Sequence, residues 1–290
     1  MSPKIAFIGA GSVRLTLDLI NDIEHEKGLS NSSIVLMGID EKSLDAIYKL
    51  TTSLSNELGD SLELEKTTNR KAVLQNADYV INTALAKAKT HEDGYEQYEK
   101  TRKLAERHGY YRGIDAQNFN RVSDYFTFTN YNQLKLALDI AESVQNICPD
   151  AWLLNTANPV FEITQLVQRE TDAKIIGICH GFHGAHSLFD TLGLDSSRVD
   201  WQVAGVNHGI WLTRFRYDGE NAYPILDNWI KDNASDWEPS DPWGYELSPA
   251  ALDMYDFYGK MPINDTVKNN TWKYHYDIAT KKDGMGNLVE

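Results

Sequence analysis

Short apolar runs alternate with amphipathic segments through the first part of the chain, and this alternation constrains the fold more than any other feature. Apolar runs of strand length lie at 4–10, 33–40, 78–84, 151–159 and 174–179. Segments with helical spacing of apolar residues lie between them, at 15–25, 41–58 and 131–147. Continuous apolar strands separated by helices are typical of a parallel sheet covered on both faces. Because crossovers between parallel strands are right-handed, the sequence predicts an α/β fold with a doubly wound, Rossmann-like parallel sheet.

The pattern changes toward the C-terminus, where helical spacing is replaced by features of antiparallel strands. Residues 198–223 contain few helical signals, and the Asp-Gly pair at 218–219 favours a tight turn in a hairpin. Aromatic-rich segments of helical character follow up to the end of the chain. We therefore expect a Rossmann-like domain at 1–178, followed at 179–290 by part of an α+β domain.

The composition limits the class of protein. The net charge is −14 and the isoelectric point is near 5.0, so the chain should repel the phosphates of nucleic acids. Two cysteines in 290 residues argue against a disulfide framework and for a reducing compartment. The apolar runs are far shorter than the roughly 20 residues that span a bilayer, and the first residues do not resemble a signal peptide. We expect a cytoplasmic protein without nucleic-acid or membrane partners.

A glycine-rich turn, IGAGSVR, joins the first predicted strand to the first predicted helix. Gly9 and Gly11, with Ser12 beside them, allow a pyrophosphate to approach the N-terminus of the helix. Asp40 ends the second predicted strand, where a carboxylate would bind the adenosine ribose, and this favours NAD over NADP. Arg14 replaces the usual third glycine and could meet a 2′-phosphate. A flavin site, or a turn that binds nothing, is an alternative interpretation.

Polar residues follow the last two predicted strands of the first domain. Cys179 closes one of these strands and Asn158 closes the other, so both side chains should lie at the carboxyl edge of the sheet, where open α/β folds bind ligands. Cys179 could be a thiolate nucleophile, a soft metal ligand together with His208, or a buried structural cysteine. The histidines of the HGFHGAH segment are a weaker metal site, because the glycines between them favour a loop.

Several long motifs, in order along the chain, make the sequence resemble glycoside hydrolase family 4. They are IGAGS at the start, YYRGIDAQNFNRVSDYFTF at 110–128, NTANP at 155–159, CHG at 179–181, AGVNHGIW at 204–211 and SPAALDMYDFYGKMPINDTVKNN at 248–270. The sequence most resembles the α-glucosidase branch. Family members are substantially longer, so we expect that this chain is truncated at its C-terminus and that the full-length protein forms homo-oligomers.

The resemblance implies a glycosidase that depends on NAD and Mn²⁺ and acts on a small α-glycoside, most simply an α-glucoside. It implies redox-elimination: a hydride leaves C3 of the sugar, a base removes the C2 proton, and the C1 substituent is eliminated. Water then adds and the hydride returns. Cys179 and His208 match the metal-binding positions of the family, and Asn158 matches a position near the substrate. The first domain would then bind NAD, and the second would bind the metal and the substrate.

The general acid and base follow less directly from the resemblance. Relatives that act on 6-phosphoglycosides carry an aspartate directly after the metal cysteine, whereas this chain has His180 there, which disfavours phosphate-bearing substrates. Asp124 becomes the candidate acid. Asp265 is the candidate base, with Tyr258 as the alternative, although an aspartate before TVKNN is equally suited to cap a helix.

Other functions remain open at this point. Within the family, an α-glucuronidase, an α-galacturonase or an α-galactosidase are alternatives, and the acidic sugars would require an additional Arg or Lys near the sugar C6. Outside the family, the alternatives are an NAD-dependent dehydrogenase of a sugar or hydroxy acid, and a non-catalytic dinucleotide-binding module. Net production of NADH would identify a dehydrogenase, because redox-elimination returns the hydride.

Overall fold

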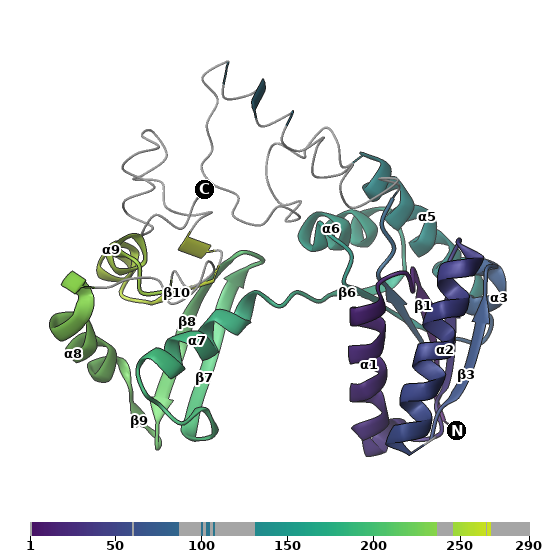
Figure 1. Ribbon diagram of the computed structural model, residues 1–290. Coiled ribbons are helices and arrows are strands. Elements are labelled where there is room, and N and C mark those ends of the chain that lie inside the picture. The colour runs from purple at the N-terminus through teal and green to yellow at the C-terminus, as the bar shows by residue number, and fades with distance from the viewer. Residues whose placement is uncertain are drawn as a thin grey trace. The chain divides into compact units, whose positions relative to one another are not determined.

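The computed structural model describes residues 2–59, 61–86, 100, 103, 104, 107, 131–236, 246–264, 266 and 267. These residues belong to two compact units, coloured from purple to teal and from teal to yellow in Figure 1. The first unit ends at Ile178 and the second continues from Cys179, and the four residues between 100 and 107 group with the second unit. Each unit has its own sheet and its own hydrophobic core.

The first unit contains a six-stranded sheet with the strand order β3–β2–β1–β4–β5–β6. The strands are β1 (Lys4–Ile8), β2 (Ser33–Met37), β3 (Glu63–Thr67), β4 (Tyr79–Asn82), β5 (Trp152–Asn155) and β6 (Lys174–Gly177). All neighbouring pairs are parallel. This is the strand order of the Rossmann fold, which binds ligands where the order reverses between β1 and β4. The predicted doubly wound sheet is confirmed.

Helices cover both faces of this sheet. They are α1 (Val13–His25), α2 (Glu41–Leu58), α3 (Arg70–Leu74), α5 (Tyr131–Ile147) and α6 (Val160–Glu170), with a short 3₁₀ helix η1 (Lys27–Leu29). Phe7 of β1 shares one core cluster with Ile20 of α1, and its neighbour Ala6 shares another with Ile140 of α5. Successive residues of a strand face opposite sides, so the sheet separates these two cores. Figure 1 shows α1 and α2 side by side over the sheet.

The first unit contains a strand and two helices that the sequence did not predict. β3 (ELEKT) is an edge strand with mostly exposed residues, so it lacks the continuous apolar run of a buried parallel strand. α3 has only five residues, which is too short to show a helical period. α6 begins directly after the TANP turn and supplies three buried residues, Val160, Ile163 and Val167.

The second unit contains an antiparallel sheet with the order β10–β8–β7, and β9 pairs with β8. Its elements are η3 (Gly181–His183), α7 (Gly184–Thr191), η4 (Ser196–Arg198), β7 (Val199–Val206), β8 (Gly209–Tyr217), β9 (Glu220–Asn221), α8 (Tyr223–Asn233), η5 (Ala234–Asp236), α9 (Pro249–Tyr258) and β10 (Pro262–Ile263). The antiparallel strands agree with the prediction. The long hairpin, however, turns at Asn207 and His208, and the turn at 218–219 only joins β8 to the short β9.

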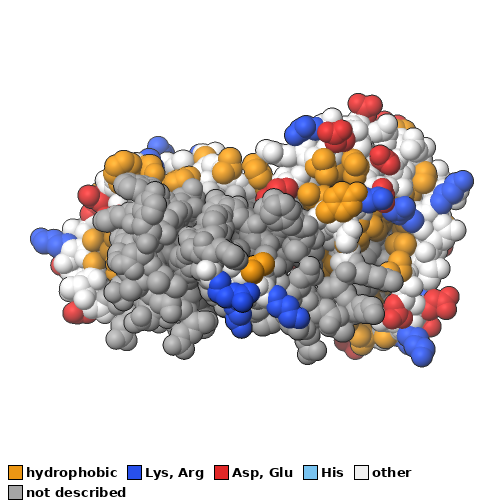
Figure 2. All heavy atoms as spheres, turned by 90° about the horizontal axis from the view of Figure 1, so that it is seen from above, with side chains coloured by type: hydrophobic (Ala, Val, Ile, Leu, Met, Phe, Trp, Pro, Cys, Tyr) orange, Lys and Arg blue, Asp and Glu red, His pale blue; other side chains and the backbone are white. Residues whose placement is uncertain are grey.

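Among the residues that Figure 2 colours, acidic and basic side chains are mixed toward the ends of the face in view, and basic side chains lie together near its middle. No helix in the described part of the chain combines the length and apolar character needed to cross a membrane.

Candidate active site

The glycine turn follows β1 and contains two glycines with different surroundings. Gly9 has a φ of +93°, and a Cβ there would lie 2.4 Å from the Cα of Ala84, just after β4. The fold itself therefore requires a glycine at this position. At Gly11 the nearest atom to an added Cβ would be the carbonyl oxygen of Gly9 at 3.9 Å. No described residue fills this space, which suits the close approach of a pyrophosphate.

Ser12 is the N-cap residue of α1, but its side chain accepts no hydrogen bond from the first turn of the helix. The first backbone N–H groups of a helix have no partner inside the helix. Because the Ser12 side chain does not occupy them, these groups suit an anion, and the positive end of the helix dipole adds to the attraction. The turn therefore fits the phosphates of a dinucleotide.

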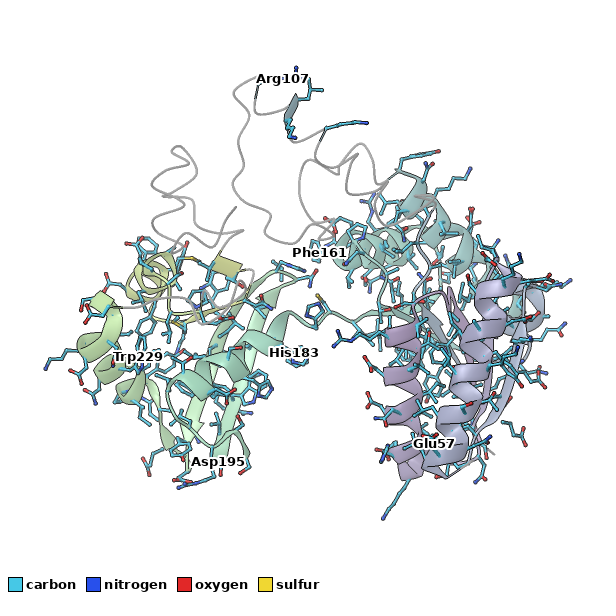
Figure 3. The ribbon with its side chains drawn as sticks, viewed as in Figure 1. Glu57, Arg107, Phe161, His183, Asp195 and Trp229 are labelled. Carbon is cyan, nitrogen blue, oxygen red and sulfur yellow. The ribbon has the colours of Figure 1, made fainter. Side chains whose placement is uncertain are left out.

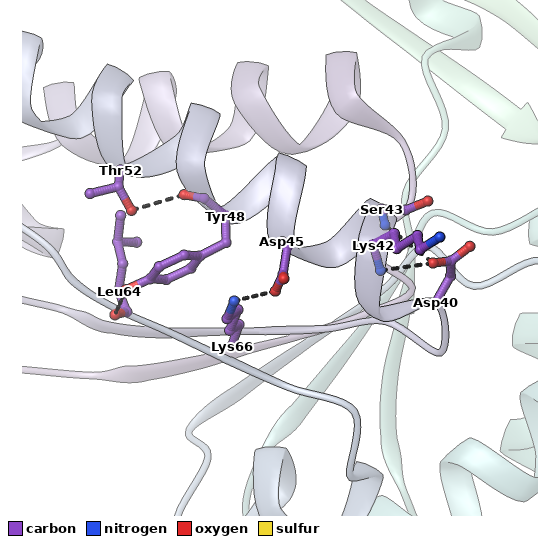
Figure 4. Close-up of polar contacts among 8 residues, drawn as sticks. All are labelled: Asp40, Lys42, Ser43, Asp45, Tyr48, Thr52, Leu64 and Lys66. Atoms are coloured by element: carbon purple, nitrogen blue, oxygen red, sulfur yellow. Dashed lines mark hydrogen bonds and ion pairs between the residues drawn. The ribbon is translucent and has the colours of Figure 1, made fainter.

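Asp40 has a structural role that the sequence analysis did not assign. β2 ends at Met37, and Asp40 is the N-cap residue of α2. Its Oδ1 accepts hydrogen bonds from the backbone N–H groups of Lys42 at 2.9 Å and Ser43 at 3.2 Å (Figure 4). Asp40 therefore lies beyond the strand end where it was predicted. Its other carboxylate oxygen, Oδ2, makes neither of these bonds and is the atom that would be left to meet a ribose hydroxyl.

Buried polar side chains hold the loops at the carboxyl edge of the first sheet. Asn82, at the end of β4, donates to Oδ1 of Asn155, at the end of β5, over 2.9 Å. Asn155 in turn donates to the carbonyl of Ala157 at 3.0 Å. Thr83 donates to the carbonyl of Gly9 at 2.7 Å, which connects the glycine turn to the exit of β4. The sequence analysis missed this network, although polar residues ending two apolar strands were its signal.

Asn158, the candidate substrate-binding residue, lies in the turn that this network supports. It is partly buried and follows Ala157, whose carbonyl is held by Asn155. The peptide bond to Pro159 is cis, and α6 begins at the next residue. β5 ends at Asn155, so the prediction that Asn158 closes the strand is wrong, and Asn158 lies in the loop that follows the carboxyl end of β5.

The second unit brings Cys179 and His208 together, although they are far apart in the sequence. The Cys179 Sγ lies 3.6 Å from the His208 Nε2. β6 ends at Gly177, so Cys179 follows the strand rather than closing it as predicted. His208 occupies the two-residue turn between β7 and β8 with a φ of +58°. Backbone in this left-handed region is uncommon for a residue with a side chain, and such positions cluster at functional sites. His208 is also buried, with 8% of its surface exposed.

The environment of Cys179 favours its thiolate. Partial burial raises the pKa of the thiol. Hydrogen bonds from the side chains of His208 and Asn207, the charge of His208 and a hydrogen bond from the backbone of Gly181 together outweigh burial, so the pKa lies below its ordinary value. The thiolate is the form that binds metals and that attacks electrophiles. The lowered pKa therefore fits a metal ligand and a nucleophile equally well.

The spacing of the pair fits a shared metal ion. Two ligands of one tetrahedral zinc ion, with bonds of about 2.3 Å to sulfur and about 2.1 Å to nitrogen, lie about 3.6 Å apart. The Sγ–Nε2 distance has this value without any movement of Cys179 or His208. In the described part of the chain, no third His, Cys, Asp or Glu joins them to form a cluster that could hold a metal.

The three histidines of the HGFHGAH segment form a row of rings. The ring centroids of His180 and His183 are 6.0 Å apart, and those of His183 and His186 are 6.3 Å apart. His183, labelled in Figure 3, stacks on Phe182 at 4.5 Å. In the described part of the chain, these histidines do not belong to a group of three or more His, Cys, Asp or Glu residues that could hold a metal.

Of the acid and base candidates, the structure describes Tyr258 alone. It ends α9 and is partly exposed, and its ring centroid lies 5.7 Å from that of Trp211 on β8. Asp124 and Asp265 lie outside the described residues. Thr266 accepts a hydrogen bond from the backbone N–H of Ile210 at 2.7 Å and donates to its carbonyl at 2.9 Å. These bonds fasten Thr266 beside β8.

A further pocket has basic side chains among its described lining residues. Its described lining residues are Lys100, Lys103, Leu104 and Arg107, the last of which is labelled in Figure 3. None of the site residues predicted from the sequence is among them. The positive charge of these described side chains contrasts with the net negative charge of the chain.

Comparisons with known proteins agree over nearly the whole chain. Residues 4–194 match the family described as "Family 4 glycosyl hydrolase", and residues 203–290 match its C-terminal domain. An α-galactosidase of Bacillus subtilis is 28% identical over 94% of this chain and 59% of its own length. An α-glucosidase of Erwinia rhapontici is 25% identical over 77% of this chain and 48% of its own length.

A solved structure also has the same fold. It is a 6-phospho-α-glucosidase from gut microorganisms in complex with NAD and Mn²⁺, with a TM-score of 0.74 and 18% sequence identity. The match covers 96% of this chain and 63% of that chain. The present chain thus spans about half to two thirds of the length of the relatives that it matches.

Proposed function

The chain belongs to family 4 of the glycosyl hydrolases, and on that premise we propose that it is an NAD- and Mn²⁺-dependent glycosidase that hydrolyses α-glucosides. The observation that carries the proposal is the pairing of Cys179 with His208 at 3.6 Å. A direct displacement at the sugar C1 needs two carboxylates and neither a thiolate nor an imidazole. The bound NAD and Mn²⁺ in the structure of the 6-phospho-α-glucosidase support the two cofactors.

The first unit would hold the dinucleotide. The N–H groups at the start of α1, with the space at Gly11, would bind the pyrophosphate, and Oδ2 of Asp40 would accept a hydrogen bond from a ribose hydroxyl. Ser12 would contribute its free hydroxyl. Because these groups belong to the backbone and to helix ends, they would orient the cofactor on rigid elements.

The second unit would hold the metal through Cys179 and His208. NAD held by the first unit would supply a reversible hydride acceptor for the sugar C3, and Mn²⁺ held by Cys179 and His208 would supply positive charge that stabilises negative charge on the sugar oxygens. Asp265, or Tyr258 in its place, would remove the proton from C2 of the oxidised sugar. Asp124 would protonate the leaving oxygen at C1, and Asn158 would orient the sugar hydroxyls.

The deciding experiment follows the C2 hydrogen. The protein, loaded with NAD and Mn²⁺, is incubated in D₂O with p-nitrophenyl α-glucoside, and the released sugar is analysed by mass spectrometry and NMR. We expect deuterium at C2 and no net NADH. Glucose that carries hydrogen at C2 would contradict redox-elimination, and accumulation of NADH would identify a dehydrogenase. The β-anomer should also be cleaved, because elimination is less bound to the geometry at C1 than displacement is.

The basic pocket favours a second candidate, an enzyme for α-glycosides of acidic sugars. Lys100, Lys103 and Arg107 could bind a carboxylate at C6, which a neutral glucoside lacks. The test compares p-nitrophenyl α-glucoside, α-galactoside, α-glucuronide and α-galacturonide. A preference for the acidic sugars that is lost in Arg107→Ala, with neutral sugars unaffected, would select this candidate over the α-glucosidase.

A further inference from the structure

Asn207 is a neighbour of both proposed metal ligands, and its side-chain oxygen has no hydrogen-bond partner among the described residues. Its side chain hydrogen-bonds to Cys179, and His208 is the next residue in the chain. The Asn207 Oδ1 is buried and has no hydrogen-bond partner in the part of the chain that the structure describes. Buried carboxamide oxygens are nearly always paired in proteins, so an unpaired one beside a candidate site calls for a ligand.

The backbone around Asn207 holds it in place. Asn207 and His208 are the two residues of the turn, and Val206 pairs with Gly209 across the hairpin. Gly205 has a φ of +144°, and a Cβ there would lie 2.1 Å from the carbonyl oxygen of Gly209. Only a glycine therefore fits where the two strands approach each other this closely. The turn places Asn207 next to Cys179.

The chemistry of the pair calls for an oxygen donor. A thiolate and an imidazole are soft and intermediate ligands, whereas Mn²⁺ prefers oxygen. Among the described residues no further His, Cys, Asp or Glu completes the site. A carboxamide oxygen is a neutral donor of the required kind, and carboxamides bind hard cations in other proteins.

Two other buried atoms without a described hydrogen-bond partner are less suited to bind a metal beside Cys179. Trp211 Nε1 is also buried without a described partner, but an indole N–H is a donor only and cannot bind a cation. Thr51 Oγ1 is a further unpaired oxygen, but it belongs to α2 in the first unit. Asn207 is the residue that combines an unpaired acceptor with contact to Cys179.

We propose that Asn207 Oδ1 is a third protein ligand of the divalent metal, added to Cys179 and His208. The proposal rests on the metal site of the proposed function and deepens it, because it explains how a cysteine–histidine pair can select Mn²⁺. An oxygen ligand contributes more to binding of Mn²⁺ than to binding of Zn²⁺, which the thiolate and imidazole already suit.

The experiment measures metal affinity in the absence of sugar. Free Mn²⁺ is determined by electron paramagnetic resonance during titration of the whole protein, and Zn²⁺ affinity is measured by competition with a chromophoric chelator. We expect Asn207→Leu to weaken Mn²⁺ binding by about tenfold or more and Zn²⁺ binding by much less. Asn207→Asp, which offers a harder oxygen in the same shape, should bind Mn²⁺ at least as tightly as the wild type.

The outcomes separate this inference from the proposed function. If the wild type binds no Mn²⁺, the metal site of the proposed function fails. If the wild type binds Mn²⁺ and Asn207→Leu binds it equally well, or loses Mn²⁺ and Zn²⁺ to the same degree, the ligand role of Asn207 is wrong. Weaker binding in Asn207→Asp would point instead to a hydrogen-bond donor that steadies the Cys179 thiolate, and would also overturn the inference. Thr51→Val, which removes the unpaired oxygen of the first unit, is the matched control and should bind both metals as the wild type does.

Discussion

The carboxyl edge of the six-stranded sheet and the tip of the β7–β8 hairpin both carry candidate site residues, but they treat their polar groups differently. At the sheet edge, Asn82 and Asn155 are fully buried and hydrogen-bonded to each other, and Asn155 also holds a loop carbonyl. At the hairpin tip, Asn207 Oδ1 is buried without a described partner, and His208 has a positive φ.

This difference indicates two kinds of site. The sheet edge is complete within the chain, so it can present backbone N–H groups and an open glycine turn to a ligand without rearrangement. The hairpin tip contains strain and an unused acceptor, which a bound ion could relieve. We therefore expect changes at the sheet edge to reduce the stability of the fold. Changes at the tip should reduce binding while leaving stability nearly unaltered.

The largest effect is expected at Gly9. An alanine there would place its Cβ 2.4 Å from backbone of Ala84 and would force a side chain into a φ of +93°. Backbone cannot move aside as a flexible side chain can, so Gly9→Ala should lose about 3 kcal/mol or more of unfolding free energy. Urea denaturation followed by circular dichroism measures this loss.

Gly11→Ala is the matched control for Gly9. Its Cβ would enter open space, so stability should change by less than about 1 kcal/mol and could rise. NAD affinity, measured by calorimetry, should nevertheless fall at least tenfold if the space receives the pyrophosphate. Equal losses of stability in the two variants would contradict the different roles that the structure gives these glycines.

The next largest loss of stability is expected at the buried pair of Asn82 and Asn155. Asn155→Ala leaves the carboxamide of Asn82 buried without its partner, which typically costs about 1–3 kcal/mol. Asn132→Ala, on the exposed side of α5, is the control and should change stability by less than about 0.5 kcal/mol. If Asn155→Ala were as stable as the control, the sheet edge would not depend on its internal hydrogen bonds, and the contrast with the hairpin tip would fail.

A smaller loss of stability is expected at Asp40, where two substitutions separate its capping role from its proposed role in NAD binding. Asp40→Ala removes an N-cap that accepts two backbone hydrogen bonds and should cost about 1 kcal/mol. Asp40→Asn keeps the cap and should be nearly as stable as the wild type, because asparagine and aspartate cap helices equally well. NAD affinity should fall in both variants if Oδ2 binds the ribose. Unchanged NAD affinity in Asp40→Asn would leave Asp40 with the capping role alone.

Particular residues show how far the sequence could lead. The apolar runs predicted five of the six parallel strands, among them the largely exposed edge strand β6, whereas the other edge strand, β3 (ELEKT), contains no apolar run. Asp40 was assigned to a strand end, although an aspartate before an amphipathic segment is also an N-cap signal. The local sequence is compatible with a strand end and with an N-cap. The structure decides for the N-cap, because β2 already ends at Met37.

The metal pair shows a different limit. Residue type and resemblance singled out Cys179 and His208, but nothing in the spacing of two distant residues could tell that their side chains lie 3.6 Å apart. The distance depends on where the hairpin turns, which is at Asn207 and His208 rather than at 218–219. Asn207 was missed for the same reason, because an unpaired buried oxygen exists only in three dimensions.

The smallest effect on stability is expected at His208. This prediction tests most directly whether the hairpin tip, unlike the sheet edge, serves binding rather than stability. Asparagine adopts positive φ more readily than most residues, so His208→Asn should keep the turn at 207–208 and compensate for the lost imidazole contacts. Without metal, the unfolding free energy of this variant should lie within about 0.5 kcal/mol of the wild type. Mn²⁺ should raise the melting temperature of the wild type but not that of the variant, because a ligand stabilises only the fold that binds it. Cys179→Ser should respond as His208→Asn does. A loss of stability in metal-free His208→Asn as large as that in Asn155→Ala would mean that the hairpin tip, like the sheet edge, is a structural element first.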